Sequence, residues 1–313
     1  MRTTLSLPWR LAQGTAVVVL AAFVAALALD RRDVLDVFWM IVIPVLPASF
    51  LVAPMLWRNV CPLATINHWT GDRTGRQPPS PQTLRLLQWT GVALLFVLVP
   101  LRHVVLNTIP VGMLALVAVV GVIVLLAGVR WAVRAGFCNG LCPVRPVELL
   151  YGQRPLVDVP RARCATCVLC VPVGCPDVWR ARTMPRLIDN HANRPWFTEP
   201  FGFFTLAFPG LVLAYFLTTD LTPWTTVYGL MLVLVAASVM TLGGLIALLR
   251  PSRALATAVL AALAFGLYYW YAAPGFAEAI RLPGGPWPVR TAAGLLLLVW
   301  VAPRGPHGNG QGG

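Results

Sequence analysis

The sequence predicts an all-α integral membrane protein with seven to eight transmembrane helices and a Cys-rich loop on the cytoplasmic side. Hydrophobic residues make up 58% of the chain and charged residues only 11%, and the mean hydropathy is +0.74. These values lie far from those of a soluble domain. Of the seven cysteines, six fall between Cys138 and Cys175. Such clustering indicates a site carried by a membrane scaffold.

Seven apolar runs are long enough, or nearly so, to cross roughly 30 Å of hydrocarbon as helices. They cover about 12–29, 34–57, 83–101, 104–131, 201–218, 224–249 and 254–273. An eighth run, about 287–302, is shorter and begins with Pro286 and Pro288. It either spans obliquely or lies partly in the interface, and we favour eight spans.

The spans divide the chain into four parts. Residues 1–131 hold four spans with the Cys61 loop at 58–82, 132–200 form a cytoplasmic Cys-rich segment, 201–302 hold three to four spans, and 303–313 form a disordered tail. The first run is preceded by arginines and contains Ala26-Leu27-Ala28, a cleavage-like pattern. Its length favours an uncleaved helix over a removed signal peptide.

The distribution of arginine predicts the orientation. Arginines that share one side with the Cys-rich loop are Arg2, Arg10, Arg58, Arg73, Arg76, Arg85, Arg130, Arg134, Arg250, Arg253 and Arg304. By the positive-inside rule this side is cytoplasmic, which predicts a multi-pass protein of the bacterial inner membrane. The net charge of +13 does not indicate nucleic-acid binding, because the arginines lie between apolar runs rather than in one basic patch.

The strongest chemical signal is a C-x2-C-x2-C-x4-C-P run formed by Cys164, Cys167, Cys170 and Cys175. Three thiolates at this close spacing can bind one iron-sulfur cube, as in bacterial ferredoxins, while the fourth ligand comes from elsewhere. Structural zinc is the alternative, since four cysteines also hold a tetrahedral ion. Zinc sites usually separate two C-x2-C pairs by a longer spacer, so the spacing favours a [4Fe-4S] cluster. A reducing cytoplasm disfavours disulfides.

A weak internal repeat places further cysteines after membrane helices. Trp57-Arg58-Asn59-Val60-Cys61-Pro62 follows the second span, and Cys138-Asn139-Gly140-Leu141-Cys142-Pro143 follows the fourth. Trp57 stands where Cys138 stands in the second copy. The residues from Pro146 to Tyr151 are predicted to form a short helix closed by Gly152.

A C-x3-C-P motif after a helix (Cys138, Cys142, Pro143), combined with the ferredoxin-like run, resembles the polyferredoxin-like [4Fe-4S] membrane proteins of the NapH, NosR and cytochrome-oxidase-assembly ferredoxin type. The resemblance covers about 34–180. It implies cytoplasmic [4Fe-4S] clusters beside a helical membrane domain, and electron transfer between the quinone pool or soluble donors and a partner redox protein. Related proteins often carry two complete copies of each motif, whereas this chain carries one complete copy of each.

Seven cysteines cannot give two clusters four thiolates each, so two arrangements remain open. With one cluster, the ligands are Cys164, Cys167 and Cys170 with either Cys175 or a cysteine of the Cys138/Cys142 pair. With two clusters, Cys61, Cys138 and Cys142 group with Cys175 in the remote-ligand pattern. A residue such as His68 or Asp177 then replaces one missing thiolate.

Two further features are predicted to be interfacial. His103 lies at the outer end of the third span, and no second histidine is placed inside a span to pair with it around a haem. Tyr268, Tyr269, Trp270 and Tyr271 are predicted to anchor near the headgroups as an aromatic belt.

Together these observations predict a membrane-bound electron-transfer component, rather than a stand-alone enzyme, that carries one or two [4Fe-4S] clusters. Its expected partners are membrane lipid, a redox partner protein and, as a further candidate, quinone, with no nucleic acid. The alternative is a non-redox membrane assembly or regulatory factor with a structural zinc site.

Overall fold

The computed structural model describes residues 7–71, 79–131, 136–157, 159 and 198–302. Within these residues every regular element is helical and there is no strand. Six helical segments are long and apolar enough to cross a membrane, and two further apolar helices are shorter. The all-α, multi-pass membrane architecture that the sequence predicts is therefore confirmed.

The six long segments include two that contain a π-helical turn. They are α1 (Leu7–Ala28), α2 with η1 and α3 (Asp33–Val37, Phe38–Val42, Ile43–Val52), α6 with η2 (Pro81–Leu101, Arg102–Leu106), α7 (Pro110–Arg130), α12 (Trp224–Leu249) and α13 (Arg253–Ala279). The shorter apolar helices are α11 (Pro200–Phe216) and α14 (Trp287–Val301).

Some helix ends differ from the prediction for identifiable reasons. The second span ends at Val52 rather than at residue 57, because Ala53 adopts φ −153° and ψ 77° and Pro54 begins a new helix, α4 (Pro54–Val60). The third span continues to Leu106 through the turn η2. The fourth span therefore begins at Pro110 rather than at residue 104, with proline in the first turn, where its missing N–H costs nothing.

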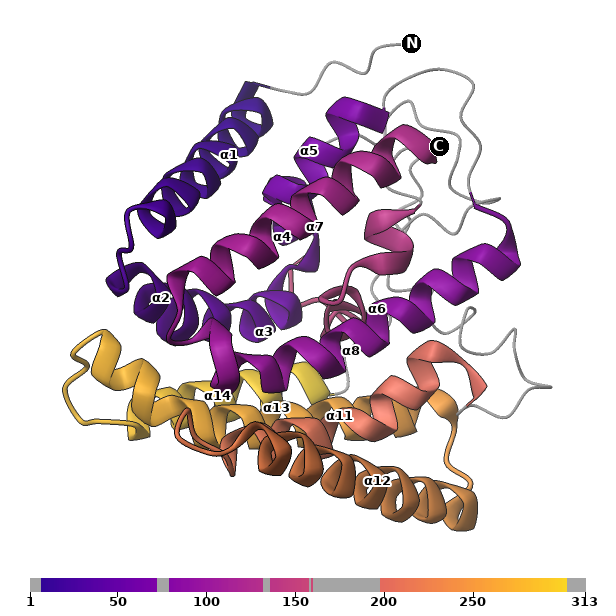
Figure 1. Ribbon diagram of the computed structural model, residues 1–313. Coiled ribbons are helices and arrows are strands. Elements are labelled where there is room, and N and C mark those ends of the chain that lie inside the picture. The colour runs from indigo at the N-terminus through magenta and orange to yellow at the C-terminus, as the bar shows by residue number, and fades with distance from the viewer. Residues whose placement is uncertain (1–6, 72–78, 132–135, 158, 160–197, 303–313) are drawn as a thin grey trace.

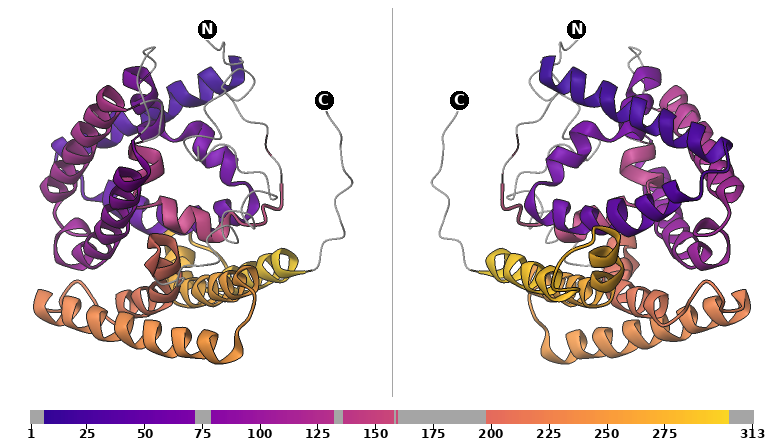
Figure 2. Two further views of the ribbon diagram at one scale, coloured as in Figure 1. Left: turned by 90° about the vertical axis from the view of Figure 1, so that its right-hand side faces the viewer. Right: turned by 90° about the vertical axis from the view of Figure 1, so that its left-hand side faces the viewer.

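Figures 1 and 2 show the helices up to α8 grouped together, with α11 to α14 forming a layer along one side of that group. The layer is held by close packing of α11 against α12. A Cβ added at Gly210 would lie 2.3 Å from the carbonyl oxygen of Leu234, and Ser238 Oγ donates to the carbonyl oxygen of Leu206 at 2.6 Å. Small residues allow two helices to approach this closely in a membrane.

Two short helices lie between the long ones. The segment 58–82, which was predicted to connect the second and third spans, contains the helix α5 (Pro62–Gly71), which packs against α7. Polar residues of α5 are paired inside the bundle. Asn67, for example, is 1% exposed and its Nδ2 donates to the carbonyl oxygen of Val124 at 2.9 Å.

The second short helix, α8 (Arg145–Tyr151), follows a π-helical turn, η3 (Phe137–Leu141), and ends at Gly152 as predicted. It contacts α3, α11 and α13. After it, the N–H groups of Leu156 and Val157 donate to the carbonyl oxygens of Leu51 and Val52. The described part of the Cys-rich segment, 137–157, thus packs among long helices of both halves of the chain.

Candidate functional site

Three of the seven predicted site cysteines lie in the described residues, and all three stand at helix boundaries. Cys61 separates α4 from α5, Cys138 lies within η3, and Cys142 follows η3 directly. No disulfide joins any two of them. Cys164, Cys167, Cys170 and Cys175 lie outside the described residues.

Cys61 and Cys142 come from segments about eighty residues apart, yet their thiols interact electrostatically. Burial, and then the proximity of Cys61, raises the pKa of the Cys142 thiol to about 12. Without a cation at its sulfur this group stays protonated at neutral pH. A bound metal reverses that preference, because metal ligation requires and stabilises the thiolate.

An ion pair is buried beside these thiols. Arg58 Nε donates to Glu148 Oε1, and the two side chains are only 6% and 9% exposed. Arg145 lies within electrostatic reach of Arg58, Glu148, Cys142 and Cys138. Burial, followed by the nearby Arg58 charge, lowers the pKa of Arg145 to about 10, still well above neutral. Both guanidinium groups therefore lie near the Glu148 carboxylate, and Arg58 is paired with it.

Backbone contacts fix the position of the turn that carries Cys138. Arg145 and Gln88 both donate to the carbonyl oxygen of Asn139. On α6, a Cβ added at Gly91 would lie 2.6 Å from the carbonyl oxygen of Gly140. Gly91 is ten residues from the start of α6 at Pro81, which corresponds to about 15 Å along the helix axis. The turn therefore packs well inside the length of a long helix rather than beyond its end.

The structure extends the weak sequence repeat to a repeat of packing. In the first copy a helix pair, α1 and α2–α3, leads into α4 and α5 around Cys61. In the second copy α6 and α7 lead into η3 and α8 around Cys142. Each short helix packs on a long helix of the other copy: α5 packs on α7, and α8 packs on α3. Cys61 and Cys142 thus occupy corresponding places where the two copies meet, which is where repeat-built membrane proteins often hold their ligands.

The donor chemistry of this region suits a thiolate-bound metal centre. It offers sulfur ligands, and the nearby guanidinium groups of Arg58 and Arg145 favour an anionic group such as a metal tetrathiolate. Among the described residues, however, no three His, Cys, Asp or Glu side chains form a group that could hold a metal ion. His68 lies on α5, seven residues from Cys61 and therefore about 10 Å further along the helix. Asp177 lies outside the described residues.

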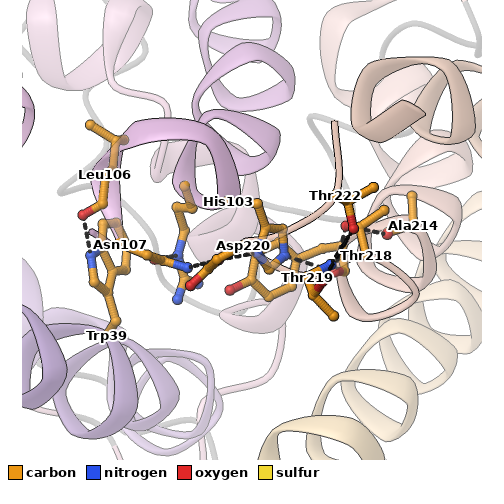
Figure 3. A network of polar contacts seen from close by, with 11 residues as sticks. Trp39, His103, Leu106, Asn107, Ala214, Thr218, Thr219, Asp220 and Thr222 are labelled. Carbon is orange, nitrogen blue, oxygen red and sulfur yellow. Dashed lines mark hydrogen bonds and ion pairs between the residues drawn. The ribbon is translucent and has the colours of Figure 1, made fainter. Parts of the chain in front are cut away.

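A second polar cluster, which we call the outer network, lies where η2 meets the turn after α11 (Figure 3). His103 on η2 is 7% exposed, so its ring is buried among neighbouring side chains. Its place near the headgroups stays a prediction. Its Nδ1 lies 2.5 Å from Asp220 Oδ1, and its Nε2 lies 3.0 Å from the carbonyl oxygen of Tyr215. Both ring nitrogens are therefore engaged, one with a carboxylate oxygen and one with a carbonyl oxygen.

Neighbouring side chains complete the outer network. Asn107 Nδ2 donates to Asp220 Oδ1 at 2.8 Å. The Arg102 guanidinium lies between the rings of Trp39 and Tyr215, at 4.0 and 4.6 Å from their centroids, a favourable cation–π arrangement. The sequence could suggest a polar site here from Arg102, His103 and Asn107, but not the partner Asp220, which is more than a hundred residues away.

The aromatic belt is partly corrected. Trp270 is 51% exposed, as expected for an anchor, but Tyr269 is 7% exposed and lies in the main hydrophobic core. Its hydroxyl donates to the carbonyl oxygen of Pro44 and accepts from the N–H of Ala48.

No known protein family, no curated protein and no solved structure matches this chain.

Proposed function

We propose that this chain is a membrane-bound electron-transfer protein that relays electrons through one or two [4Fe-4S] clusters. The candidate ligands are Cys61, Cys138, Cys142, Cys164, Cys167, Cys170 and Cys175. When bound, such a cluster supplies reversible one-electron transfer at a potential set by its surroundings. The resemblance to polyferredoxin-like membrane proteins, drawn from the cysteine motifs, supports this assignment.

The observation that carries the proposal is the buried charge beside the thiols. Arg145 lies within electrostatic reach of Cys138 and Cys142, and Arg58 is nearby. A cluster with four thiolate ligands is an anion in both its common oxidation states, so this neighbouring positive charge would stabilise it.

These residues have separate roles in the proposal. The cysteines hold the cluster, Arg58 and Arg145 stabilise its negative charge, and Glu148 fixes Arg58. Gln88 and Gly91 position the turn around Cys138. We place the cysteine face at the cytoplasmic side of a bacterial inner membrane, on the arginine distribution, with a redox partner protein and, as a further candidate, quinone as electron donors or acceptors.

The test is anoxic purification followed by iron, sulfide and zinc analysis and by EPR of the reduced protein. We expect iron and acid-labile sulfide, together with the EPR signal of a reduced [4Fe-4S] cluster. Cys167→Ser should abolish or alter this signal. Arg145→Met should lower cluster content or shift its reduction potential, whereas Arg10→Met, at an exposed arginine on α1, should do neither. A colourless, iron-free protein would contradict the proposal.

The alternative is a non-redox assembly or regulatory factor with a structural zinc site. The charge balance also suits this reading, because a zinc tetrathiolate is an anion as well. The C-x2-C-x2-C spacing favours iron. Stoichiometric zinc without iron in the anoxic preparation would establish the alternative.

A further inference from the structure

Arg290, in the first turn of α14, is held against α13. Its Nε and Nη2 donate to the carbonyl oxygen of Trp270 at 3.1 and 2.9 Å. In a regular helix this carbonyl accepts from the N–H four residues further on, but that residue is Pro274, which has no N–H. The guanidinium therefore satisfies a backbone group that Pro274 leaves open, and the fold fixes its position.

Two indole rings flank the same guanidinium group. Its central carbon lies 4.2 Å from the ring centroid of Trp270 and 5.2 Å from that of Trp287, both within the range of a cation–π interaction. The two rings meet edge to face with centroids 6.4 Å apart. They are 51% and 61% exposed, so they face the surroundings of the protein. We call Trp270, Trp287 and Arg290 the indole–arginine cluster.

The cluster keeps hydrogen-bond donors available. A guanidinium has five N–H groups, and Arg290 uses only two of them on the Trp270 carbonyl. Within the part of the chain that the structure describes, no carboxylate forms an ion pair with Arg290. The nearest charged positions along the chain, Glu278 and Arg281, are both exposed. A fixed positive charge with free donors is therefore presented beside two exposed aromatic rings.

The position of the cluster along α13 suits the depth of lipid headgroups. The helix has 27 residues, which is about 40 Å, whereas the hydrocarbon core is roughly 30 Å thick. Trp270 lies about 25 Å along the axis from the start of α13. In Figure 1 the turn between α13 and α14 lies at the left, on the same side as the connection between α1 and α2. Exposed tryptophans at such a level are typical of the membrane interface.

We propose that the indole–arginine cluster is a binding site for an anionic phospholipid such as phosphatidylglycerol. The free N–H groups of Arg290 donate to the phosphate oxygens, since a guanidinium matches phosphate geometry. The exposed faces of the indoles pack against the glycerol and the adjoining methylene groups. A choline headgroup fits worse, because the guanidinium already lies over the rings and repels a second cation. The site is separate from the cysteines and does not depend on the proposed function.

The test uses the full chain, delipidated in detergent and titrated with phosphatidylglycerol, phosphatidylcholine, diacylglycerol or inorganic phosphate. Native mass spectrometry counts the bound lipid. The thermal unfolding midpoint is the second readout, because a ligand that binds only the folded state raises it. We expect phosphatidylglycerol to bind most tightly and to raise the midpoint most. Equal binding of diacylglycerol, or an equal rise with inorganic phosphate, would overturn the inference.

Variants separate the cluster from general attraction to charge. Arg290→Gln should weaken phosphatidylglycerol binding severalfold, whereas Arg281→Gln, which removes the same charge from the turn before α14, should not. Because Arg290→Gln also leaves the Trp270 carbonyl open, Trp287→Leu is the second variant, and it keeps both hydrogen bonds of Arg290. It should unfold at the original temperature without lipid, yet bind phosphatidylglycerol severalfold more weakly.

Trp224→Leu is the matched control for the indole, because Trp224 on α12 is 63% exposed and lies outside the cluster. It should bind phosphatidylglycerol as the unaltered protein does. Equal losses in Arg281→Gln and Arg290→Gln, or full binding in both Arg290→Gln and Trp287→Leu, would overturn the inference.

Discussion

The hydroxyl of Tyr269 on α13 lies 2.5 Å from the carbonyl oxygen of Pro44 on α3. It also accepts from the N–H of Ala48 at 3.1 Å. In a regular α-helix the N–H of Ala48 would donate to the carbonyl of Pro44. The hydroxyl therefore stands between the two groups of one helical hydrogen bond, in a segment that already contains Pro44 and Pro47. Such insertion opens a helix and fixes its bend.

Tyr269→Phe should destabilise the protein. It leaves the carbonyl of Pro44 and the N–H of Ala48 without their bridging partner, and an unsatisfied buried polar group costs about 1–3 kcal/mol. The measurement is the thermal unfolding midpoint in detergent. Tyr271→Phe is the control, since Tyr271 is 38% exposed. Equal midpoints for the two variants would show that the bridge contributes nothing.

Gly210→Ala should loosen the packing of α11 on α12. The added methyl group would meet the backbone of Leu234 at 2.3 Å, and backbone cannot rotate away as a side chain can. Overpacking of this kind costs about 1–3 kcal/mol. At Gly229, on the same helix pair, nothing lies within 4 Å of an added Cβ. Gly229→Ala should therefore unfold at the original temperature or above it, and a matching loss at both glycines would contradict the packing argument.

The main helices were predictable from the sequence because length and apolar composition alone identify them. Their breaks were not. Residues on both sides of Ala53 are apolar, so the run 34–57 reads as one helix although Pro54 starts another. The helix α5 was hidden for the opposite reason, because a polar residue such as Asn67 looks like part of a loop until α7 is available to pair with it.

The candidate site could likewise be predicted only in part. The cysteines and the internal repeat were visible as motifs. The structure adds that the short helix of each copy packs on a long helix of the other copy, α5 on α7 and α8 on α3. The pairing of Arg58 with Glu148 was not visible, since ninety residues separate the partners and no local spacing rule links them. His103 was placed correctly along its helix, but its burial depends on Asp220, which arrives from a distant turn.

Glu148→Gln should destabilise the fold strongly. The substitution removes the carboxylate charge that Arg58 contacts and that lies within electrostatic reach of Arg145. Breaking a buried ion pair from one side costs about 3–5 kcal/mol. The double variant Arg58→Met with Glu148→Leu should recover much of this loss, because an apolar pair needs no compensation. Unfolding midpoints of the single and double variants give the comparison, and a double variant that sums two independent losses would contradict it.

Asp220→Asn should weaken the attachment of the turn after α11 to η2. An amide cannot replace the charge that accepts from both His103 and Asn107, and a hydrogen bond to a charged group contributes about 1.5–3 kcal/mol. We expect faster hydrogen exchange confined to residues near 217–223. Glu278→Gln, at an exposed acid near the end of α13, should leave exchange unchanged. If residues 217–223 exchange at the same rate in Asp220→Asn as in the unaltered protein, the network does not hold this turn.

Gly91→Ala should displace the turn that carries Cys138 and Cys142 without unfolding α6. The new Cβ would lie 2.6 Å from the carbonyl oxygen of Gly140 and 3.3 Å from the backbone carbon of Leu141, so the turn must move away. Within α6 itself the change from glycine to alanine favours the helix by about 0.5–1 kcal/mol. Metal-free protein provides the first readout, since the partly buried Cys142 thiol should react faster with maleimide once the turn has shifted. Anoxically purified protein provides the second, as lower iron content. Gly121→Ala on α7, where nothing lies within 4 Å, should change neither. If Cys142 stays as unreactive in Gly91→Ala as in the unaltered protein, close packing on α6 does not position the turn.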